Sequence, residues 1–278
     1  MNTPHQSDNE QSTLWNGVAG RAWVEAQSLT DHLFKPIEDL LVEAVSPAAG
    51  NLLDVGCGTG STTIAALRRM GAHGRATGID ISEPMLAAAA VRARRDGAAA
   101  NFIRADAQTH PLDPAAFDLV ISRFGVMFFD DPVQAFANLH RATKPLGGLR
   151  CIVWRSAADN PFMTTAERAA APVLELPERK KDGPGQFAFA DRDKVQGILQ
   201  NGGWAQIDFR AVDVICTMPQ RELTGYLSRL GAVGRALQEA DEETRARVLA
   251  VVRPAFDPYV QGDDVRFTAA CWLITARV

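Results

Sequence analysis

The sequence has few of the features that mark secreted, membrane or metal-binding proteins. Its 278 residues include only four cysteines, at positions 57, 151, 216 and 271, and no pair has the short spacing of a zinc knuckle or redox motif. No run reaches the roughly 18 apolar residues that a membrane span needs. The first 13 residues are polar and lack the apolar core of a secretion signal. We therefore expect reduced cysteines in a soluble, cytoplasmic protein.

The sequence also lacks an excess of positive charge, since its formal net charge is −4. A chain of this charge has no general attraction to nucleic acid, and short basic runs such as Arg92–Arg95 are typical of solvated helix faces. Asp130 and Asp131 form the one local carboxylate pair near a predicted strand end, and Asp131 is better explained as a helix cap because Pro132 follows it. We expect no nucleic-acid partner and no metal.

Strand-like and helix-like segments alternate through the first half of the chain. This alternation predicts an α/β fold with a parallel sheet covered by helices on both faces. Two helices, at 20–30 and 36–45, precede the first strand. The sequence then predicts strands at 51–55, 75–80, 100–105, 117–122 and 148–155, and helices at 60–70, 83–95 and 132–143.

The second half of the chain has a different pattern. Residues 156–204 are helical and rich in loops, with helices expected at 160–176 and 191–200, and they resemble a cap inserted before the last strands. Two β-branched and aromatic runs, 205–216 and 265–276, read as strands. The segment between them, 221–259, is predicted to be helical.

The most informative segment runs from Asn51 to Gly60, where an apolar strand leads into three glycines at every second position. Glycine lets a ligand approach the main chain closely. The N-terminus of the following helix would favour a carboxylate or phosphate. The third glycine comes one residue earlier than in the dinucleotide fingerprint, and Asp80 ends the next strand, where it can accept hydrogen bonds from ribose hydroxyls. The ligand is therefore expected to contain ribose without being a dinucleotide.

Three ordered motifs carry a family resemblance: Asp54–Gly60, Gly78–Ser82 and Arg104–Ala107. Together they resemble a class I S-adenosylmethionine-dependent methyltransferase of the quinone-biosynthesis and natural-product branch. The resemblance extends over residues 51–155, and the tryptophan and glycine residues of 15–23 match as well.

The resemblance implies a Rossmann-like, mostly parallel sheet with an antiparallel last strand and helical cap insertions. It suggests four regions. They are N-terminal helices at 1–48 that contribute to a lid, a cofactor-binding core at 49–155, a cap at 156–204, and the last two strands at 205–278 with the helical insert 221–259.

The resemblance also implies S-adenosylmethionine as the cofactor and gives roles to individual residues. In these enzymes the three glycines pass beneath the adenosine and methionine parts, and the acid after the second strand holds the ribose. The acid and the backbone after the third strand read the adenine edge, and the first acid orients the loop or contacts the methionine amino group through water. The corresponding residues here are Gly56, Gly58, Gly60, Asp80, Asp106, Ala107 and Asp54.

Further cofactor contacts are expected from apolar, aromatic and basic side chains. Aromatic faces stabilise a sulfonium cation. Apolar residues after Asp80 can pack on adenine, and the exit of the strand at 117–122 lines the transfer site in this fold. These candidates are Trp15, Arg21, Trp23, Ile81, Met85, Ser122 and Phe124, with Phe129 as a further aromatic. Alternatives stay open: the apolar side chains can be core residues, Arg21 can be a surface residue, and Asp54 and Asp106 can be turn-stabilising residues.

The predicted reaction is methyl transfer by in-line displacement to an O, N or C atom of a small, partly apolar metabolite. A general base is optional in such a reaction, and His110 and His140 are the two histidine candidates. Residues 122–125 lack the Asn/Asp-Pro-Pro-aromatic motif of base-modifying enzymes. Two rivals remain, a non-catalytic nucleoside sensor and a nicotinamide-dependent oxidoreductase. The residues leave the oligomeric state open, with a homodimer among the alternatives.

Overall fold

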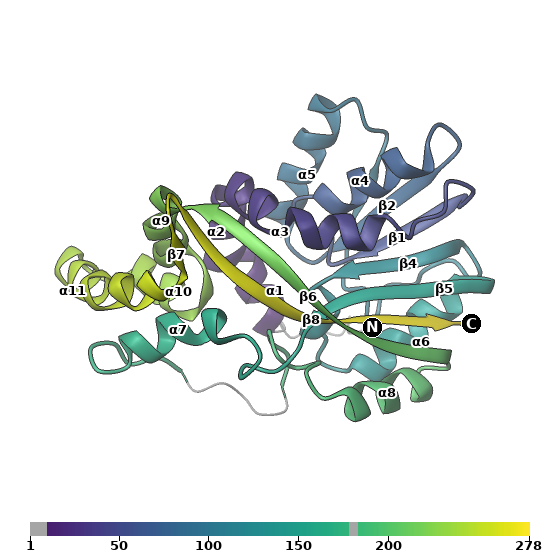
Figure 1. The fold of residues 1–278 in the computed structure, drawn as a ribbon. Coiled ribbons are helices and arrows are strands. Elements are labelled where there is room, and N and C mark those ends of the chain that lie inside the picture. The colour runs from purple at the N-terminus through teal and green to yellow at the C-terminus, as the bar shows by residue number, and fades with distance from the viewer. Residues whose placement is uncertain (1–9, 178–182) are drawn as a thin grey trace, which may run out of the picture.

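A single sheet forms the centre of the protein in the computed structural model, which describes residues 10–177 and 183–278 (Figure 1). Its strand order is β3-β2-β1-β4-β5-β8-β6, and the short β7 pairs with β8. The strands are β1 Asn51–Val55, β2 Arg75–Asp80, β3 Asn101–Arg104, β4 Phe117–Arg123, β5 Thr143–Trp154, β6 Ala205–Pro219, β7 Val260–Gln261 and β8 Asp264–Arg277.

Strands β1 to β5 are parallel, and β8 is antiparallel to both β5 and β6. Since β8 lies between these two strands, β6 runs in the same direction as β1 to β5. The prediction of a mostly parallel sheet closed by an antiparallel last strand is confirmed. The chain crosses from β3 on one side of β1 to β4 on the other, so the strand order reverses at β1. In open parallel sheets, ligands bind at the carboxyl ends of the strands beside such a reversal.

Helices cover the two faces of the sheet (Figure 1). On one face, α3 packs against β4, β5 and β6, α4 against β1 and β2, and α5 against β3. On the other face, α6 contacts β5 and α8 contacts both α6 and β6. The bounds of these helices are α3 Gln27–Val42, α4 Ser61–Met70, α5 Glu83–Arg95, α6 Pro132–Ala142 and α8 Arg192–Asn201.

The N-terminal helices begin and end at different residues from those predicted. The structure has α1 Glu10–Asn16, α2 Val18–Glu25 and the 16-residue α3, which contains Pro36 in its interior. Pro36 was predicted to begin a helix, because proline removes an intrahelical hydrogen bond and costs about 3 kcal/mol in a helix interior. The apolar stripe of α3 continues across it, with Leu33, Phe34, Ile37 and Leu41 all buried. Burial of this stripe outweighs the local penalty.

Strand β5 also differs from its prediction, because it begins at Thr143 instead of residue 148. The pairing with β4 shifts register between Phe117 and Leu119, and Leu146 has a φ of 68°. The residues between Thr143 and Gly148 therefore form a bulge inside the strand.

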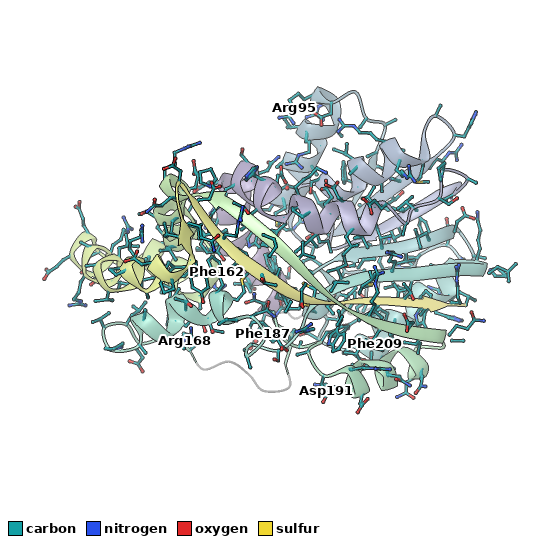
Figure 2. All side chains as sticks on the ribbon, viewed as in Figure 1. Arg95, Phe162, Arg168, Phe187, Asp191 and Phe209 are labelled. Atoms are coloured by element: carbon teal, nitrogen blue, oxygen red, sulfur yellow. The ribbon has the colours of Figure 1, made fainter. Side chains whose placement is uncertain are left out.

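The long strands β6 and β8 extend beyond the sheet and carry a group of helices at one end of the molecule (Figure 1). Between them lie η2 Gln220–Glu222, α9 Leu223–Arg229, α10 Gly231–Glu239, α11 Glu242–Val252 and η3 Arg253–Tyr259. Helix α7, Pro161–Ala170, contacts α10, α11 and η3. Phe162 of α7 stacks on Phe267 of β8, with ring centroids 3.9 Å apart (Figure 2).

Residues 156–204, predicted as a cap, thus have two locations in the fold. Helix α7 belongs to the helical end that β6 and β8 carry, whereas α8 packs on the sheet beside α6. The segment 178–182 within this range lies outside the described residues. In the described part of the chain, no helix has the length and apolar character needed to cross a membrane.

Two glycines of the α8 region give a matched test of the packing. Gly197 lies inside α8, and a Cβ added there meets nothing within 4 Å. A Cβ added at Gly202, which follows the helix, would lie 2.9 Å from the Cβ of Phe136. We predict that Gly197→Ala raises the free energy of unfolding by about 0.5 to 1 kcal/mol, because alanine is the better helix former. Gly202→Ala should lower it. Urea unfolding of both variants measures this, and equal effects would contradict the packing.

Candidate functional site

The three loop glycines all adopt the left-handed conformation that favours glycine. Their φ angles are 67° at Gly56, 53° at Gly58 and 81° at Gly60. A Cβ at Gly56 would lie 2.6 Å from the Cα of Gly125, which follows β4. The main chains after β1 and β4 therefore touch, and the loop lies at the carboxyl edge of the sheet with Gly58 and Gly60 buried.

Asp80 fixes the far side of this loop. Its Oδ2 accepts a hydrogen bond from the Gly58 amide at 2.8 Å, and its Oδ1 accepts one from the Ser82 amide at 2.9 Å. Burial raises the pKa of this carboxyl, and the backbone donors act in the opposite direction. Each carboxylate oxygen has a second lone pair, so both can also accept from a ligand hydroxyl.

Asp54 faces helix α4 and is 1% exposed. Its Oδ2 accepts a hydrogen bond from the Thr63 hydroxyl at 2.7 Å. Burial raises its pKa to about 7, which the Thr63 bond and the charge of Arg123 only partly offset. This contact ties β1 to α4 across the loop, which is what a loop-orienting residue requires.

The segment after β3 forms a tight turn. The Oδ1 of Asp106 accepts a hydrogen bond from the Gln108 amide at 2.9 Å. The side-chain amide of Asn138 on α6 donates to the carbonyls of Ala107 and His110, at 2.8 Å each. The turn therefore has a structural function in this state, and the adenine-reading roles of Asp106 and Ala107 stay predictions.

The first helix is attached to the loop that follows Asp80. The Ser82 hydroxyl donates to the carbonyl of Trp15 at 2.6 Å, and the Asn16 side chain donates to the carbonyl of Ile81 at 3.0 Å. The Asn16 side-chain oxygen also accepts from the amide of Glu83 at 2.9 Å. Helix α1 is thus placed beside the proposed ribose-binding residue.

Two aromatic clusters lie near the ends of β4 and β5. Trp15 meets Trp23 and Phe128 edge to face, with ring centroids 6.4 Å and 5.2 Å apart. Phe124, which has a φ of 67°, stacks on Trp154 with centroids 4.6 Å apart. Positive φ is unfavourable for a bulky residue such as Phe124, so contacts such as the stacking on Trp154 must compensate for the strain.

The other aromatic and apolar candidates lie in different surroundings. Phe129 packs edge to face on Phe136 of α6 instead of joining either cluster. Met85 is buried, and its Cε lies 2.8 Å from the position of a Cβ on Gly58. Arg21 is exposed, as the surface alternative for this residue requires.

Ser122 links the exits of two strands. It is fully buried, its hydroxyl donates to the carbonyl of Val55 at 2.8 Å, and its oxygen accepts from the amide of Gly125 at 3.2 Å. The structure thereby brings the β4 exit against the glycine loop.

His140 is not brought together with the other candidates. It lies in the last turn of α6, just before β5 begins, and its ring packs edge to face on Trp204 with centroids 5.4 Å apart. The start of β5 pairs with the start of β4, at the edge opposite the glycine loop. His110 follows β3 and belongs to the turn held by Asn138.

Arg123, the last residue of β4, was missed among the predicted site residues. Its Nη2 donates to the Ser61 hydroxyl at 3.0 Å, and its Nη1 is buried without a hydrogen-bond partner in the described residues. A charge at the end of an apolar strand is the signal that could have identified it. No group of three or more potential metal ligands occurs in the described residues.

Comparison with known proteins agrees with this geometry. Residues 52–147 match the family model described as a methyltransferase domain. The chain is 28% identical over 184 residues to a demethylmenaquinone methyltransferase of Staphylococcus haemolyticus, covering 63% of this chain and 75% of the relative. It is 36% identical over 116 residues to nocamycin O-methyltransferase of Saccharothrix syringae, covering 41% of each.

Among solved structures, phosphoethanolamine N-methyltransferase 2 of Haemonchus contortus, in complex with S-adenosyl-L-methionine, aligns with a TM-score of 0.59. The alignment covers 99% of this chain and 61% of that chain, at 16% identity. At this level of identity the likeness supports the fold.

A pair of glycine variants separates backbone strain from the close contact in the loop. Gly56 and Gly71 both have positive φ, but a Cβ at Gly71 meets nothing within 4 Å. We predict that Gly71→Ala lowers the free energy of unfolding by about 1 kcal/mol, from strain alone. Gly56→Ala adds a clash with Gly125 and should lower it by about 3 kcal/mol. Chemical denaturation measures both values. Equal losses would contradict the contact between the two loops.

The buried Asp54 predicts a pH dependence of stability. A carboxyl whose pKa rises on folding from 3.8 to about 7 stabilises the folded state below pH 4, and this contribution is lost as the pH rises through 7. Asp54→Asn cannot ionise. We predict that its stability relative to the wild type improves by about 2 kcal/mol between pH 5 and pH 8. Urea unfolding at the two pH values measures the difference, and a constant difference would show that Asp54 is ionised throughout.

Proposed function

We propose that the chain is a class I S-adenosylmethionine-dependent methyltransferase that methylates a small, partly apolar metabolite, and the match of residues 52–147 to a methyltransferase domain supports this. The transfer would occur by in-line displacement to an O, N or C atom of the acceptor. Its products would be the methylated compound and S-adenosylhomocysteine.

The observation that carries this proposal is the joint placement of Asp80 and the glycine loop. Asp80 accepts from the Gly58 and Ser82 amides, which holds its carboxylate at the strand exit with lone pairs left for two hydroxyls. A ribose supplies two adjacent hydroxyls. The loop glycines add no side chain of their own to the approach beside it, where the Met85 side chain packs against Gly58.

The residues present fit an adenosyl cofactor with an amino-acid part. The glycine loop would pass beneath it and Asp80 would hold the ribose. Among residues 10–177 and 183–278, the buried Nη1 of Arg123 and Oγ1 of Thr62 have no hydrogen-bond partner, and an anionic group could supply one. Bound S-adenosylmethionine supplies an electrophilic methyl group on a sulfonium. The protein must hold the acceptor in line with that group, which can contribute up to roughly 7 to 11 kcal/mol to the lowering of the barrier.

The surroundings of the site support an apolar acceptor. Phe124, Trp154 and Phe34 form one aromatic cluster beside the β4 exit, and Trp15, Trp23 and Phe128 form another. Helices α1 and α2, with the helical end carried by β6 and β8, would exclude water during transfer. We assign the helices before residue 49 to the lid, 49–155 to the cofactor-binding core and 205–278 to the last strands with their helical insert; of the region 156–204, α7 belongs to the cap, while α8 packs on the sheet.

We infer a small-molecule acceptor instead of a nucleic acid, because the net charge is −4. The four cysteines are all free and buried, which supports action in a reducing cytoplasm.

Ligand-dependent unfolding tests the cofactor. S-adenosylmethionine and S-adenosylhomocysteine, each at about 100 times its Kd, should add about 2.7 kcal/mol to stability and raise Tm by several degrees. NAD should have no effect, since the loop spacing differs from the dinucleotide fingerprint. Stabilisation by NAD alone would favour an oxidoreductase, and no stabilisation by any of the three would remove the proposed function.

The role of Asp80 is tested by substitution. We predict that Asp80→Ala weakens S-adenosylhomocysteine binding by about 1.5 to 3 kcal/mol, because two ribose hydroxyls lose a charged acceptor. Asp113→Ala, at an exposed carboxylate after β3, is the matched control and should bind as the wild type does. Isothermal titration calorimetry gives both affinities. Unchanged affinity in a folded Asp80→Ala variant would exclude the ribose contact.

A further inference from the structure

The guanidinium of Arg123 lies between the glycine loop and the first turn of α4. It extends from the last position of β4, beside Ile152 of β5, and its Nη2 donates to the hydroxyl of Ser61. Ser61 is the first residue of α4 and directly follows the third loop glycine. Arg123 therefore bonds to the residue that directly follows the glycine loop, which carries the cofactor motif.

One half of this guanidinium has no acceptor. Its Nη1 is buried and makes no hydrogen bond in the described residues, where Arg123 also takes part in no ion pair. Arginine keeps its charge when buried, and its planar fork is suited to bind two oxygens of one anion. A buried cationic N–H without an acceptor is unfavourable, so this position calls for an anionic partner.

Nearby acidic residues do not neutralise Arg123 completely. Asp54 on β1 interacts with the charge of Arg123, but burial raises the pKa of Asp54 to about 7 and its Oδ2 accepts a hydrogen bond from Thr63. Glu38 of α3, also buried, lies 3.6 Å from the amine of Lys35. Positive charge is thus left for an incoming group.

The first turn of α4 adds donors to the same place. Gly60, its N-cap residue, provides no side-chain cap for the amides of the turn. Thr62, in that turn, is 2% exposed and its hydroxyl has no partner in the described residues. Helix N-termini favour negative charge, and here a cationic side chain reaches the same turn.

We propose that Arg123 binds an anionic oxygen in the candidate site, together with Ser61 and the first turn of α4. This inference rests on the proposed function, because both sources of such an oxygen come from it. One source is the carboxylate of the cofactor's amino-acid part. The other is a carboxylate or oxyanion of the acceptor, whose negative charge Arg123 would stabilise next to the transfer site.

Either source is consistent with the direction of the side chain. Asp54 and the α4 turn lie on the side of the glycine loop. Cys216 of β6, towards the helical end, also feels the charge: burial raises the pKa of its thiol to about 12, and Arg123 acts against that rise. The geometry on the side of the cofactor motif is the hydrogen bond from Arg123 to Ser61.

The experiment compares Arg123→Gln, Arg123→Lys and the wild type with two adenosyl ligands. S-adenosylhomocysteine has the amino-acid carboxylate, and 5′-methylthioadenosine lacks it. If Arg123 binds the cofactor, Arg123→Gln should lose at least tenfold in affinity for the first ligand and nothing for the second. Arg123→Lys should recover part of the loss, since it keeps the charge without the fork. Calorimetric titration measures each Kd.

If Arg123 instead binds the acceptor, both adenosyl ligands should bind all variants equally. Benzoate, used as an aromatic carboxylate probe, should then bind the wild-type complex with S-adenosylhomocysteine and lose at least tenfold in Arg123→Gln. Unchanged affinity for all three probes would overturn the inference.

Arg69→Gln is the matched control, since Arg69 is an exposed arginine in the last turn of the same helix. Thermal unfolding confirms that each variant is folded. If Arg123→Gln does not fold, Ser61→Ala replaces it, with the same expected pattern at a smaller loss. The proposed function fails separately, when the wild type binds neither adenosyl ligand.

Discussion

The close contact between the main chains of Gly56 and Gly125 is the constraint on which the candidate site depends. A Cβ on either residue would lie within 2.7 Å of the other residue's backbone. The ends of β1 and β4 can therefore lie this close only because both positions are glycine. Ser122 reinforces the contact by bonding to the carbonyl of Val55. With these exits fixed, the loop amide of Gly58 reaches Asp80 and the end of β4 brings Arg123 to α4.

The electrostatics of the site follow from burial at this junction. Asp54, Asp80 and Arg123 each lie at or near the end of a strand beside the glycine loop. The two carboxylates have different hydrogen-bond partners. Asp80 is satisfied by backbone amides, and Asp54 by a threonine hydroxyl, while burial raises the pKa of both. In the described residues, Nη1 of the arginine makes no hydrogen bond. The site thus combines hydroxyl-accepting carboxylates with a donor set for an anion, which is the polarity expected for an adenosyl ligand with an amino-acid part.

Segments distant in sequence complete the site. Trp15 and Asn16 of α1 bond to residues 81–83 after β2, and Trp154 at the end of β5 stacks on Phe124. The helices between β6 and β8 lie at the same end of the molecule as α1 and α2, and α10 contacts α2 (Figure 1). Three separate parts of the chain therefore lie around the candidate site.

The sequence by itself determined the alternating elements, the glycine loop and Asp80, because strand and helix periodicity and glycine spacing are local properties. It also indicated the antiparallel closing strand through the family motifs. Tertiary structure alone decided that α3 runs through Pro36, that His140 lies at the opposite edge of the sheet, and that Phe128 instead of Phe129 joins Trp15. It also decided that Nη1 of Arg123 has no hydrogen-bond partner within the part of the chain that the structure describes. These outcomes depend on which side chains pack together from distant parts of the chain. Burial and long-range contacts determine that packing, and no local sequence pattern contains them.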